Sequence, residues 1–350
     1  MTTTTRRGLA AAASALLAAP ALLTPARRAR AQEAQTLRLH HFLPAVSNAH
    51  RNFLQPWARK VEQDSGGRLR VQIFPAMQLG GAPPQLFDQA RDGVADIVWT
   101  LPGNTPGRFP RIEVFELPFV AHKRGVVNAR AVQEYAERHL REEFREVHPI
   151  CVWGHDNGLI HSNRQVSRME DLEGLKLRFP TRQTGEALRA LGASAIGMPI
   201  PQVPESLSQR VIDGAVVPWE VVPSIRLHEL VRNHTEIPGT PTLYVATFIL
   251  AMNRARYEGL PADLRAVLDA NSGTVAAEAA GRMWDEQAGP AAEMARRRGN
   301  TITVLTEDEA RRWQRQTQPV VDAWVSATPG GGALLEEARA LVAKHGAGIA

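Results

Sequence analysis

Strand-like segments alternate with helical patterns along this chain, and that alternation restricts its fold more than any other feature. Residues 37–43 and 69–74 have the two-residue period of strands, and residues 95–100 form a short buried strand. Between the first two, residues 50–63 place apolar side chains at helical spacing. A β-α-β order of this kind predicts a mostly parallel sheet with helices on its faces.

The same order returns in a second block. The further predicted elements are helices at 126–147, 185–191 and 203–210 and strands at 150–154, 175–179, 194–198 and 215–217. Residues 243–253 form a long strand that returns toward the first block, and residues 262–318 are almost continuously helical, with a break near 298–300. Two α/β blocks joined by a crossing strand predict an α/β protein of two lobes with a cleft between them.

Residues 1–31 have the features of an export signal. Arg6 and Arg7 precede an alanine-rich apolar stretch, and Ala29-Arg30-Ala31 offers a cleavage site after Ala31. The paired arginines are typical of a twin-arginine signal, although a Sec signal with two arginines would look similar. The apolar stretch is too short and too rich in alanine for a membrane anchor. We therefore expect an exported protein whose mature part begins near Gln32.

The net charge of the chain comes from this N-terminal segment. The 350 residues include 41 Lys and Arg against 36 Asp and Glu, a formal net charge of +5. Five arginines lie within the predicted signal and no acid precedes Glu33, so the mature chain has equal numbers of basic and acidic residues. A formally neutral protein gives no electrostatic reason to expect nucleic-acid binding.

The sequence lacks the usual motifs of catalysis and cofactor binding. It has no G-x-G-x-x-G after a strand, no Walker A loop, no G-x-S-x-G turn and no H-E-x-x-H. Its histidines are dispersed, and its single cysteine, Cys151, lies in an apolar strand where a buried, unreactive thiol is expected. We therefore expect neither an enzyme nor a cofactor or metal centre.

Three predicted strands end in side chains suited to a binding pocket. Arg178 ends one strand just before a proline, and a guanidinium there can form a bidentate pair with a carboxylate. Trp99 ends another, and Trp219 and Glu220 follow Pro218 at the end of a third. From spacing alone, Arg178 could equally lie on the surface and the tryptophans could belong to the core.

Six short segments follow one another in an order that is specific when taken together. They are Ser65-Gly66-Gly67-Arg68, Met77-Gln78-Leu79-Gly80, Asp92-Gly93-Val94-Ala95-Asp96, Glu116-Leu117-Pro118-Phe119, Asp171-Leu172-Glu173-Gly174-Leu175-Lys176-Leu177-Arg178 and Val211-Ile212-Asp213-Gly214. In order and spacing they resemble the substrate-binding proteins of TRAP transporters, the DctP-type family, from Leu37 to about Trp324. The resemblance implies a periplasmic receptor that captures an organic acid and delivers it to the membrane permease subunits, which run on an ion gradient.

The resemblance also implies a two-lobed periplasmic binding protein fold with hinge strands and a long helix that crosses both lobes. We expect lobe I to comprise residues 32–155 and 243–282, and lobe II residues 156–242 and 283–330. Residues 331–350 would then form a C-terminal helix or tail.

The family motif that ends in Arg178 bears on the ligand. In the family, the arginine at this position pairs with the ligand carboxylate. This sequence departs from the family's usual pattern at two positions. Ile160 stands where many members carry a second arginine after the Asn-Gly pair, and Val217 stands where an asparagine often touches the carboxylate. Without these polar partners, the second negative charge of a small dicarboxylate would be poorly compensated in the pocket. We expect an aromatic or branched apolar monocarboxylate, or a 2-oxo acid.

The remaining candidates complete this predicted pocket. Trp99, Trp219 and Phe42 would form its walls, while His41, His161 and Glu220 would hydrogen-bond a ligand hydroxyl, keto or amide group or else stabilise the lobes. Glu220 could also hold a cation that bridges to the carboxylate.

Two other functions fit the same pocket. One is a periplasmic ligand sensor that acts on a signalling receptor. The other is a periplasmic enzyme on organic acids, with Glu220 and His161 as acid and base.

Overall fold

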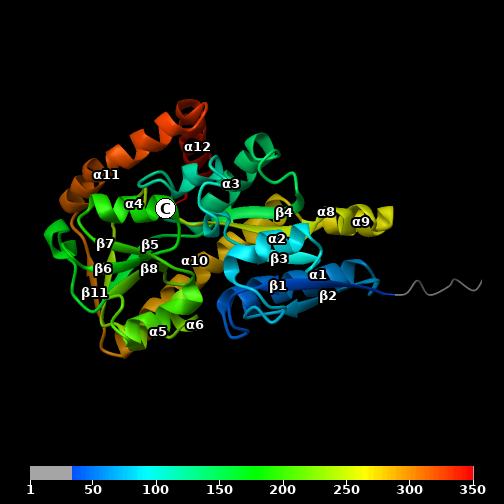
Figure 1. Ribbon diagram of the computed structural model, residues 1–350, viewed down its shortest axis with the longest axis horizontal. Helices are drawn as coiled ribbons and strands as arrows, with labels where there is room; N and C mark the ends of the chain where they lie inside the picture. The colour runs from blue at the N-terminus through cyan, green and yellow to red at the C-terminus, as the bar shows by residue number, and fades with distance from the viewer. Residues whose placement is uncertain (1–33, 350) are drawn as a thin grey trace, which may run out of the picture. The chain divides into compact units, whose positions relative to one another are not determined.

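Two β-sheets organise residues 34–349, the part of the chain that the computed structural model describes (Figure 1). The predicted export signal lies outside these residues. The mixed α/β fold agrees with the prediction, because each sheet combines parallel strands with helices that pack on it. None of the helices within residues 34–349 is long and apolar enough to cross a membrane.

The first sheet has the strand order β2-β1-β3-β10-β4. These strands are β1 (Gln35–His41), β2 (Leu69–Phe74), β3 (Ile97–Thr100), β4 (Val147–Gly154) and β10 (Thr247–Asn253). β1 pairs in parallel with β2 and β3, whereas β10 runs antiparallel to β3 and β4. β10 thus returns from the second half of the chain into the first sheet, as its sequence position predicts. We call this sheet with its helices the first lobe.

The second sheet has the order β11-β9-β5-β8-β6-β7. Its strands are β5 (Gly158–Ser162), β6 (Lys176–Phe179), β7 (Ser194–Gly197), β8 (Gly214–Pro218), β9 (Asn233–Glu236) and β11 (Thr301–Val304). β6 runs parallel to β7 and β8, and β5 runs antiparallel to β8 and β9. We call this sheet with its helices the second lobe.

Most helices lie between the strands in chain order. They are α1 (Gln55–Asp64), α2 (Leu86–Arg91), α3 (Gly125–His139), α4 (Arg182–Ala190), α5 (Val203–Ser208), α6 (Val221–Ser224), α7 (Leu227–Leu230), α8 (Arg254–Glu258) and α9 (Ala262–Ala270). A π-helical turn, η1 (Ala49–Leu54), leads into α1, and short 3-10 turns include η4 (Ile112–Glu116) and η5 (Met169–Leu172). Two parallel β-α-β units therefore meet the expectation from the alternating pattern.

Three long helices follow β10. The longest, α10 (Thr274–Arg297), packs on α3 and β4 of the first lobe and on β11 of the second, as the long crossing helix of the predicted fold would (Figure 1). A Cβ atom added at Gly281 would lie 2.6 Å from the carbonyl oxygen of Gly125, so only glycine lets α10 approach α3 this closely. α11 (Glu307–Ala327) packs on α4, and α12 (Gly331–Gly346) packs on α3 and α11.

Some predicted elements differ from the structure. The helix predicted at 126–147 ends at His139, and the stretch predicted as almost continuously helical at 262–318 contains β11. β11 lies at the edge of the second sheet and half its residues are exposed, so it lacks the apolar pattern of a buried strand. The pattern also does not predict β5 and β9.

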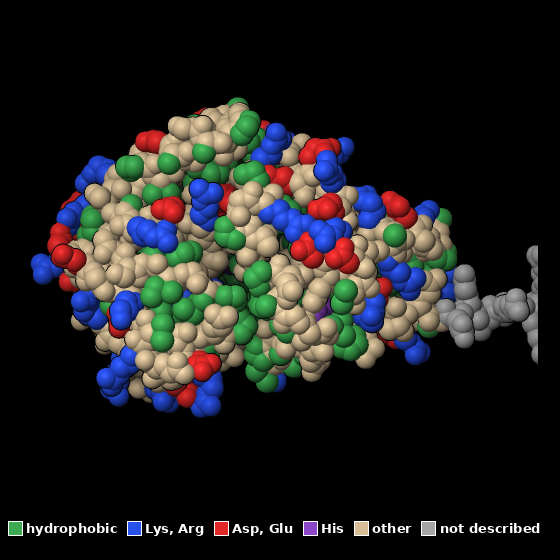
Figure 2. All heavy atoms as spheres, in the orientation of Figure 1, with side chains coloured by type: hydrophobic (Ala, Val, Ile, Leu, Met, Phe, Trp, Pro, Cys, Tyr) green, Lys and Arg blue, Asp and Glu red, His purple; other side chains and the backbone are tan. Residues whose placement is uncertain are grey.

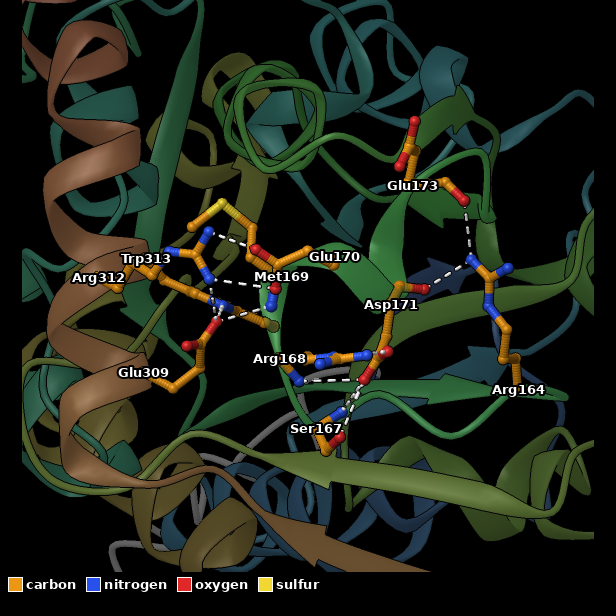
Figure 3. Close-up of polar contacts among 10 residues, drawn as sticks. All are labelled: Arg164, Ser167, Arg168, Met169, Glu170, Asp171, Glu173, Glu309, Arg312 and Trp313. Atoms are coloured by element: carbon orange, nitrogen blue, oxygen red, sulfur yellow. Dashed lines mark hydrogen bonds and ion pairs between the residues drawn. The ribbon is translucent and has the colours of Figure 1, made fainter.

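The segment before β6 is held in place by capping contacts. The Asp171 carboxylate accepts hydrogen bonds from the backbone N–H of Ser167 at 2.8 Å and of Arg168 at 3.1 Å, and from the Ser167 hydroxyl at 2.9 Å (Figure 3). Gly174 has φ +66°, a conformation that favours glycine. The aspartate and glycine of the family motif therefore shape the turn that leads into β6.

Side chains of helix α11 also contact the turn that leads into β6. The Glu309 carboxylate accepts a hydrogen bond from the backbone N–H of Met169 at 2.6 Å and another from Trp313 Nε1 at 2.9 Å (Figure 3). Arg312 pairs with Glu170. These contacts fix the start of β6, the strand that carries Arg178.

Candidate ligand-binding site

A pocket lies between the two lobes, and hydrophobic side chains gather around a hollow on the face shown in Figure 2. Its cavity measures about 60 Å³, and about 550 Å³ when the open mouth is included. The lining comes from both lobes and from two segments that connect them, one between β4 and β5 at His155 and one between β9 and β10 at Tyr244 and Ala246. Of the predicted site residues, five line it: Phe42, Trp99, Arg178, Val217 and Glu220.

Arg178 is a buried cationic side chain in the lining of this pocket. β6 places it opposite Ala215 of β8, and it is only 4% exposed. Its Nε donates to the carbonyl oxygen of Met198 at 2.8 Å and its Nη1 to that of Val216 at 3.3 Å. These two carbonyls orient the guanidinium.

No acidic side chain within residues 34–349 forms an ion pair with Arg178. Burial lowers the pKa of its guanidinium to about 10, so the group is still a cation at neutral pH. A buried cation without a counter-ion is unfavourable, and an anion entering the pocket would relieve it.

Aromatic rings form the walls of the first-lobe side. The centroid of Phe42 lies 4.8 Å from that of Trp99, and Phe248 lies 5.7 Å from Trp99 and 5.3 Å from Trp284. All four residues line the pocket. Flat apolar walls of this kind favour a ligand with an aromatic or planar apolar body.

Glu220 joins the two lobes at the pocket. Its Oε1 accepts a hydrogen bond from the backbone N–H of Ala49 at 3.1 Å, and its backbone carbonyl accepts one from Asn48 Nδ2 at 2.9 Å. Asn48 and Ala49 belong to the first lobe. Burial raises the pKa of the Glu220 carboxyl to about 7, so near neutral pH a large share of it is uncharged.

The structure does not bring His161 to the pocket lining. Asn300 Nδ2 donates to Nε2 of His234, 3.0 Å away, which leaves Nδ1 of His234 as a donor to Nδ1 of His161, 2.6 Å away. Nε2 of His161 then donates to the carbonyl oxygen of Val217 at 3.1 Å. Both ring nitrogens of His161 are thus occupied behind the pocket wall.

His41 and Trp219 also lie outside the lining. His41 Nδ1 accepts a hydrogen bond from the backbone N–H of Leu43 at 3.2 Å, and its Nε2 lies 2.9 Å from Nδ1 of His50. Trp219 Nε1 donates to Oε1 of Glu236 at 2.8 Å. These side chains support the walls from behind.

Sequence reasoning missed several lining residues, among them the aromatic and polar side chains of His155, Tyr244, Phe248 and Trp284. His155 directly follows β4, so the rule that sites form at strand ends could have found it. Tyr244 lies in a crossing segment and Trp284 on α10, and nothing in their local sequence indicates a site. Within residues 34–349, no group of three His, Cys, Asp or Glu side chains is arranged to hold a metal ion.

The two-lobed fold with a pocket between its sheets matches a known family. Residues 39–327 fit the DctP family model, described as bacterial extracellular solute-binding protein, family 7. The chain belongs to this family. Its members are transport receptors rather than enzymes, and they act outside the cytoplasm on small molecules.

Solved structures from this family resemble the chain over nearly the whole described part. A TRAP solute-binding protein from Rhodoferax ferrireducens T118, in complex with copurified benzoate, is 44% identical, with a TM-score of 0.88 over 91% of this chain and 100% of that one. A marine metagenome TRAP solute-binding protein specific for aromatic acid ligands, in complex with 3-hydroxybenzoate, is 40% identical, with a TM-score of 0.88 over 89% of this chain and 99% of that one.

A curated relative is longer than the matched region. The uncharacterized protein y4mM of Sinorhizobium fredii is 32% identical over 235 residues, which are 65% of this chain and 42% of that protein. The match therefore covers less than half of that relative. The chain itself is a TRAP solute-binding protein of the DctP family.

Proposed function

We propose that this protein is the periplasmic receptor of a TRAP transporter for an aromatic monocarboxylate, with Arg178 pairing with the ligand carboxylate. The observation that carries the proposal is a buried arginine that has no acidic partner among residues 34–349 and lines a pocket walled by aromatic rings. A benzoate-like acid suits both the guanidinium and the aromatic walls, because its carboxylate would neutralise Arg178 and its ring would lie against Phe42 and Trp99. The aromatic acids bound by the two similar proteins support the same ligand class.

Ligand capture would proceed by closure of the lobes. The Glu220 contacts with Asn48 and Ala49 join them beside the pocket, and Gln183 Nε2 of α4 donates to Oε2 of Glu113 in η4 at 2.6 Å. The ligand favours closure only through interactions that it makes more strongly in the closed form. The loaded receptor would then deliver the acid to the permease subunits.

Arg178 provides one cation, and among residues 34–349 no other arginine or lysine lines the pocket. A dicarboxylate would therefore bury an uncompensated negative charge, which is costly in an apolar site. This agrees with the expectation drawn from Ile160 and Val217. Glu220 offers a ring hydroxyl or keto group a polar partner at the same pocket.

The test is calorimetric titration of the exported protein, purified from the periplasm, with benzoate, 3-hydroxybenzoate, succinate and benzyl alcohol. We expect the two aromatic acids to bind, and to raise the unfolding free energy by about 2.7 kcal/mol at a hundredfold excess over Kd. Tighter binding of succinate, or no binding of either aromatic acid, would refute the proposal. Mass spectrometry of the same preparation should show a chain that begins at Gln32.

A further inference from the structure

Tyr244 brings a buried hydroxyl to the pocket lining. Its side chain lines the cavity and is only 1% exposed. Its hydroxyl oxygen is buried and has no hydrogen-bond partner among residues 34–349. Leaving a buried hydroxyl unpaired costs free energy comparable to a lost hydrogen bond, and most buried polar groups in proteins are therefore paired. An unpaired hydroxyl in the wall of a binding pocket indicates a partner that arrives with the ligand.

The ring of Tyr244 is held in one place by its neighbours. A Cβ atom added at Gly158 would lie 2.2 Å from Cε1 of Tyr244 and 2.5 Å from Cζ, so the ring occupies space that only a glycine leaves free. The Asn-Gly pair of the sequence therefore has a structural reason here: Gly158 makes room for this phenol.

His155 fixes the ring from a second direction. The two ring centroids are 5.4 Å apart in an edge-to-face arrangement. His155 is itself held, because its Nε2 accepts a hydrogen bond from the backbone N–H of Ala246 at 2.9 Å and its Nδ1 donates to the carbonyl oxygen of Asp156 at 2.6 Å. The Tyr244 hydroxyl is thus positioned before any ligand binds, so little freedom is lost when it makes a hydrogen bond.

Tyr244 lies within reach of the charge on Arg178. The guanidinium favours the ionised phenol, but burial outweighs it and raises the pKa of Tyr244 well above its ordinary value. The hydroxyl therefore keeps its hydrogen at neutral pH and acts as a donor. A cationic fork and a neutral donor line the same pocket, and a carboxylate can accept from both.

We propose that Tyr244 donates its hydroxyl hydrogen to the ligand carboxylate held by Arg178. The inference rests on the proposed function, since it needs an acid at Arg178. A cationic donor and a neutral donor favour a carboxylate over a carboxamide, because a carboxylate offers two charged acceptor oxygens where an amide offers one neutral oxygen.

The test is calorimetric titration of Tyr244→Phe with benzoate, combined with the melting temperature of the ligand-free protein. We expect benzoate affinity to fall about 10- to 100-fold, the range for removing a hydrogen bond to a charged group. The melting temperature without ligand should stay the same or rise, since the lost hydroxyl has no partner in the protein.

Tyr135→Phe is the matched control. Tyr135 is also fully buried, but its hydroxyl donates to the carbonyl oxygen of Arg111 at 3.2 Å and does not line the pocket. This variant should show the opposite pattern, with a lower melting temperature and an affinity within twofold of the wild type.

The outcomes separate the inference from the proposed function. Tyr244→Phe with unchanged affinity overturns the inference alone, provided that the wild type binds benzoate. A lower ligand-free melting temperature in Tyr244→Phe also overturns it, because the hydroxyl would then have a partner inside the protein. Failure of the wild type to bind benzoate or 3-hydroxybenzoate overturns both.

Discussion

Replacing Arg178 by methionine should stabilise the ligand-free protein while removing its affinity for acids. Methionine is flexible enough to occupy much of the same space, and it carries no charge. In the wild type the guanidinium is buried, has no acidic partner among residues 34–349 and donates to only two carbonyls, those of Met198 and Val216. In the ligand-free protein, this buried and unpaired guanidinium therefore lowers the free energy of unfolding.

The magnitude follows from the pKa of this group. Burial lowers it from 12.5 to about 10, so keeping the charge in the folded protein costs ~3 kcal/mol. Losing the two hydrogen bonds costs ~1 kcal/mol each. The ligand-free variant should therefore gain ~1 kcal/mol of unfolding free energy. Benzoate affinity should fall by about 100-fold or more, the scale for removing one partner of a desolvated charge pair.

Urea denaturation without ligand and calorimetric titration with benzoate measure the two effects separately. Arg189→Met is the control: Arg189 lies on α4, is about half exposed and pairs with Glu186 at 3.0 Å. It should change stability by less than about 0.5 kcal/mol and leave affinity unchanged. The reasoning fails if Arg178→Met is less stable than the wild type by more than about 2 kcal/mol, or if it binds benzoate within fivefold of the wild type.

Three further predictions concern other buried groups. Burial raises the pKa of Glu116 to about 7 from 4.5, so the folded form keeps a proton that the unfolded chain releases, and stability should fall as pH rises from about 4.5 to 7. Glu116→Gln should remove ~3 kcal/mol of that decline in urea denaturation at pH 4.5 and 8, and an unchanged decline would contradict this. Trp219→Phe should cost ~1 kcal/mol of stability by removing its bond to Glu236, and leave benzoate affinity within threefold; a tenfold loss would place Trp219 at the ligand. The Cys151 thiol is fully buried and burial raises its pKa, so a disulfide reagent should modify it only after unfolding, and rapid modification of the native protein would exclude this burial.

Local sequence patterns were sufficient for the elements that bury one continuous face. β2 occupies the same residues that the alternation at 69–74 predicts, and β6 and β8 lie within one residue of their predicted bounds. These strands are apolar enough for periodicity to reveal them. The paired acidic and glycine residues of the 171–178 motif likewise have a local cause, since Asp171 caps the turn and Gly174 has a positive φ.

Elements stabilised by distant partners could not be predicted in this way. β9 and β11 are short and pair with each other in parallel, although more than 60 residues of chain separate them. β9 has the polar sequence Asn-His-Thr-Glu, and β11 (Thr-Ile-Thr-Val) alternates over only four residues, too few to separate it from the helical pattern around it. Pairing with distant segments makes them strands: β9 pairs with β5 and β11 in the folded protein.

The sequence by itself determined the class of the protein and indicated the arginine that we propose as the ligand anchor. The alternation of strands and helices indicated two α/β lobes, the motif order indicated the family, and the same motif singled out Arg178. The strand and helix patterns depend on residues that are close together in the chain, so local physical chemistry reveals them. The family and Arg178 were recognised from the order of motifs along residues 65–214.

The tertiary structure decided which side chains surround that anchor. His161 lies on β5 and Trp219 directly follows β8, and both strands carry or adjoin lining residues. Hydrogen bonds to His234 and Glu236 of β9 nevertheless hold the two side chains outside the pocket lining. Tyr244 and Trp284 reach the pocket from a crossing segment and from α10. A binding pocket is a set of side chains brought together from distant segments, and their facing directions are fixed only when the sheets and the long helix pack.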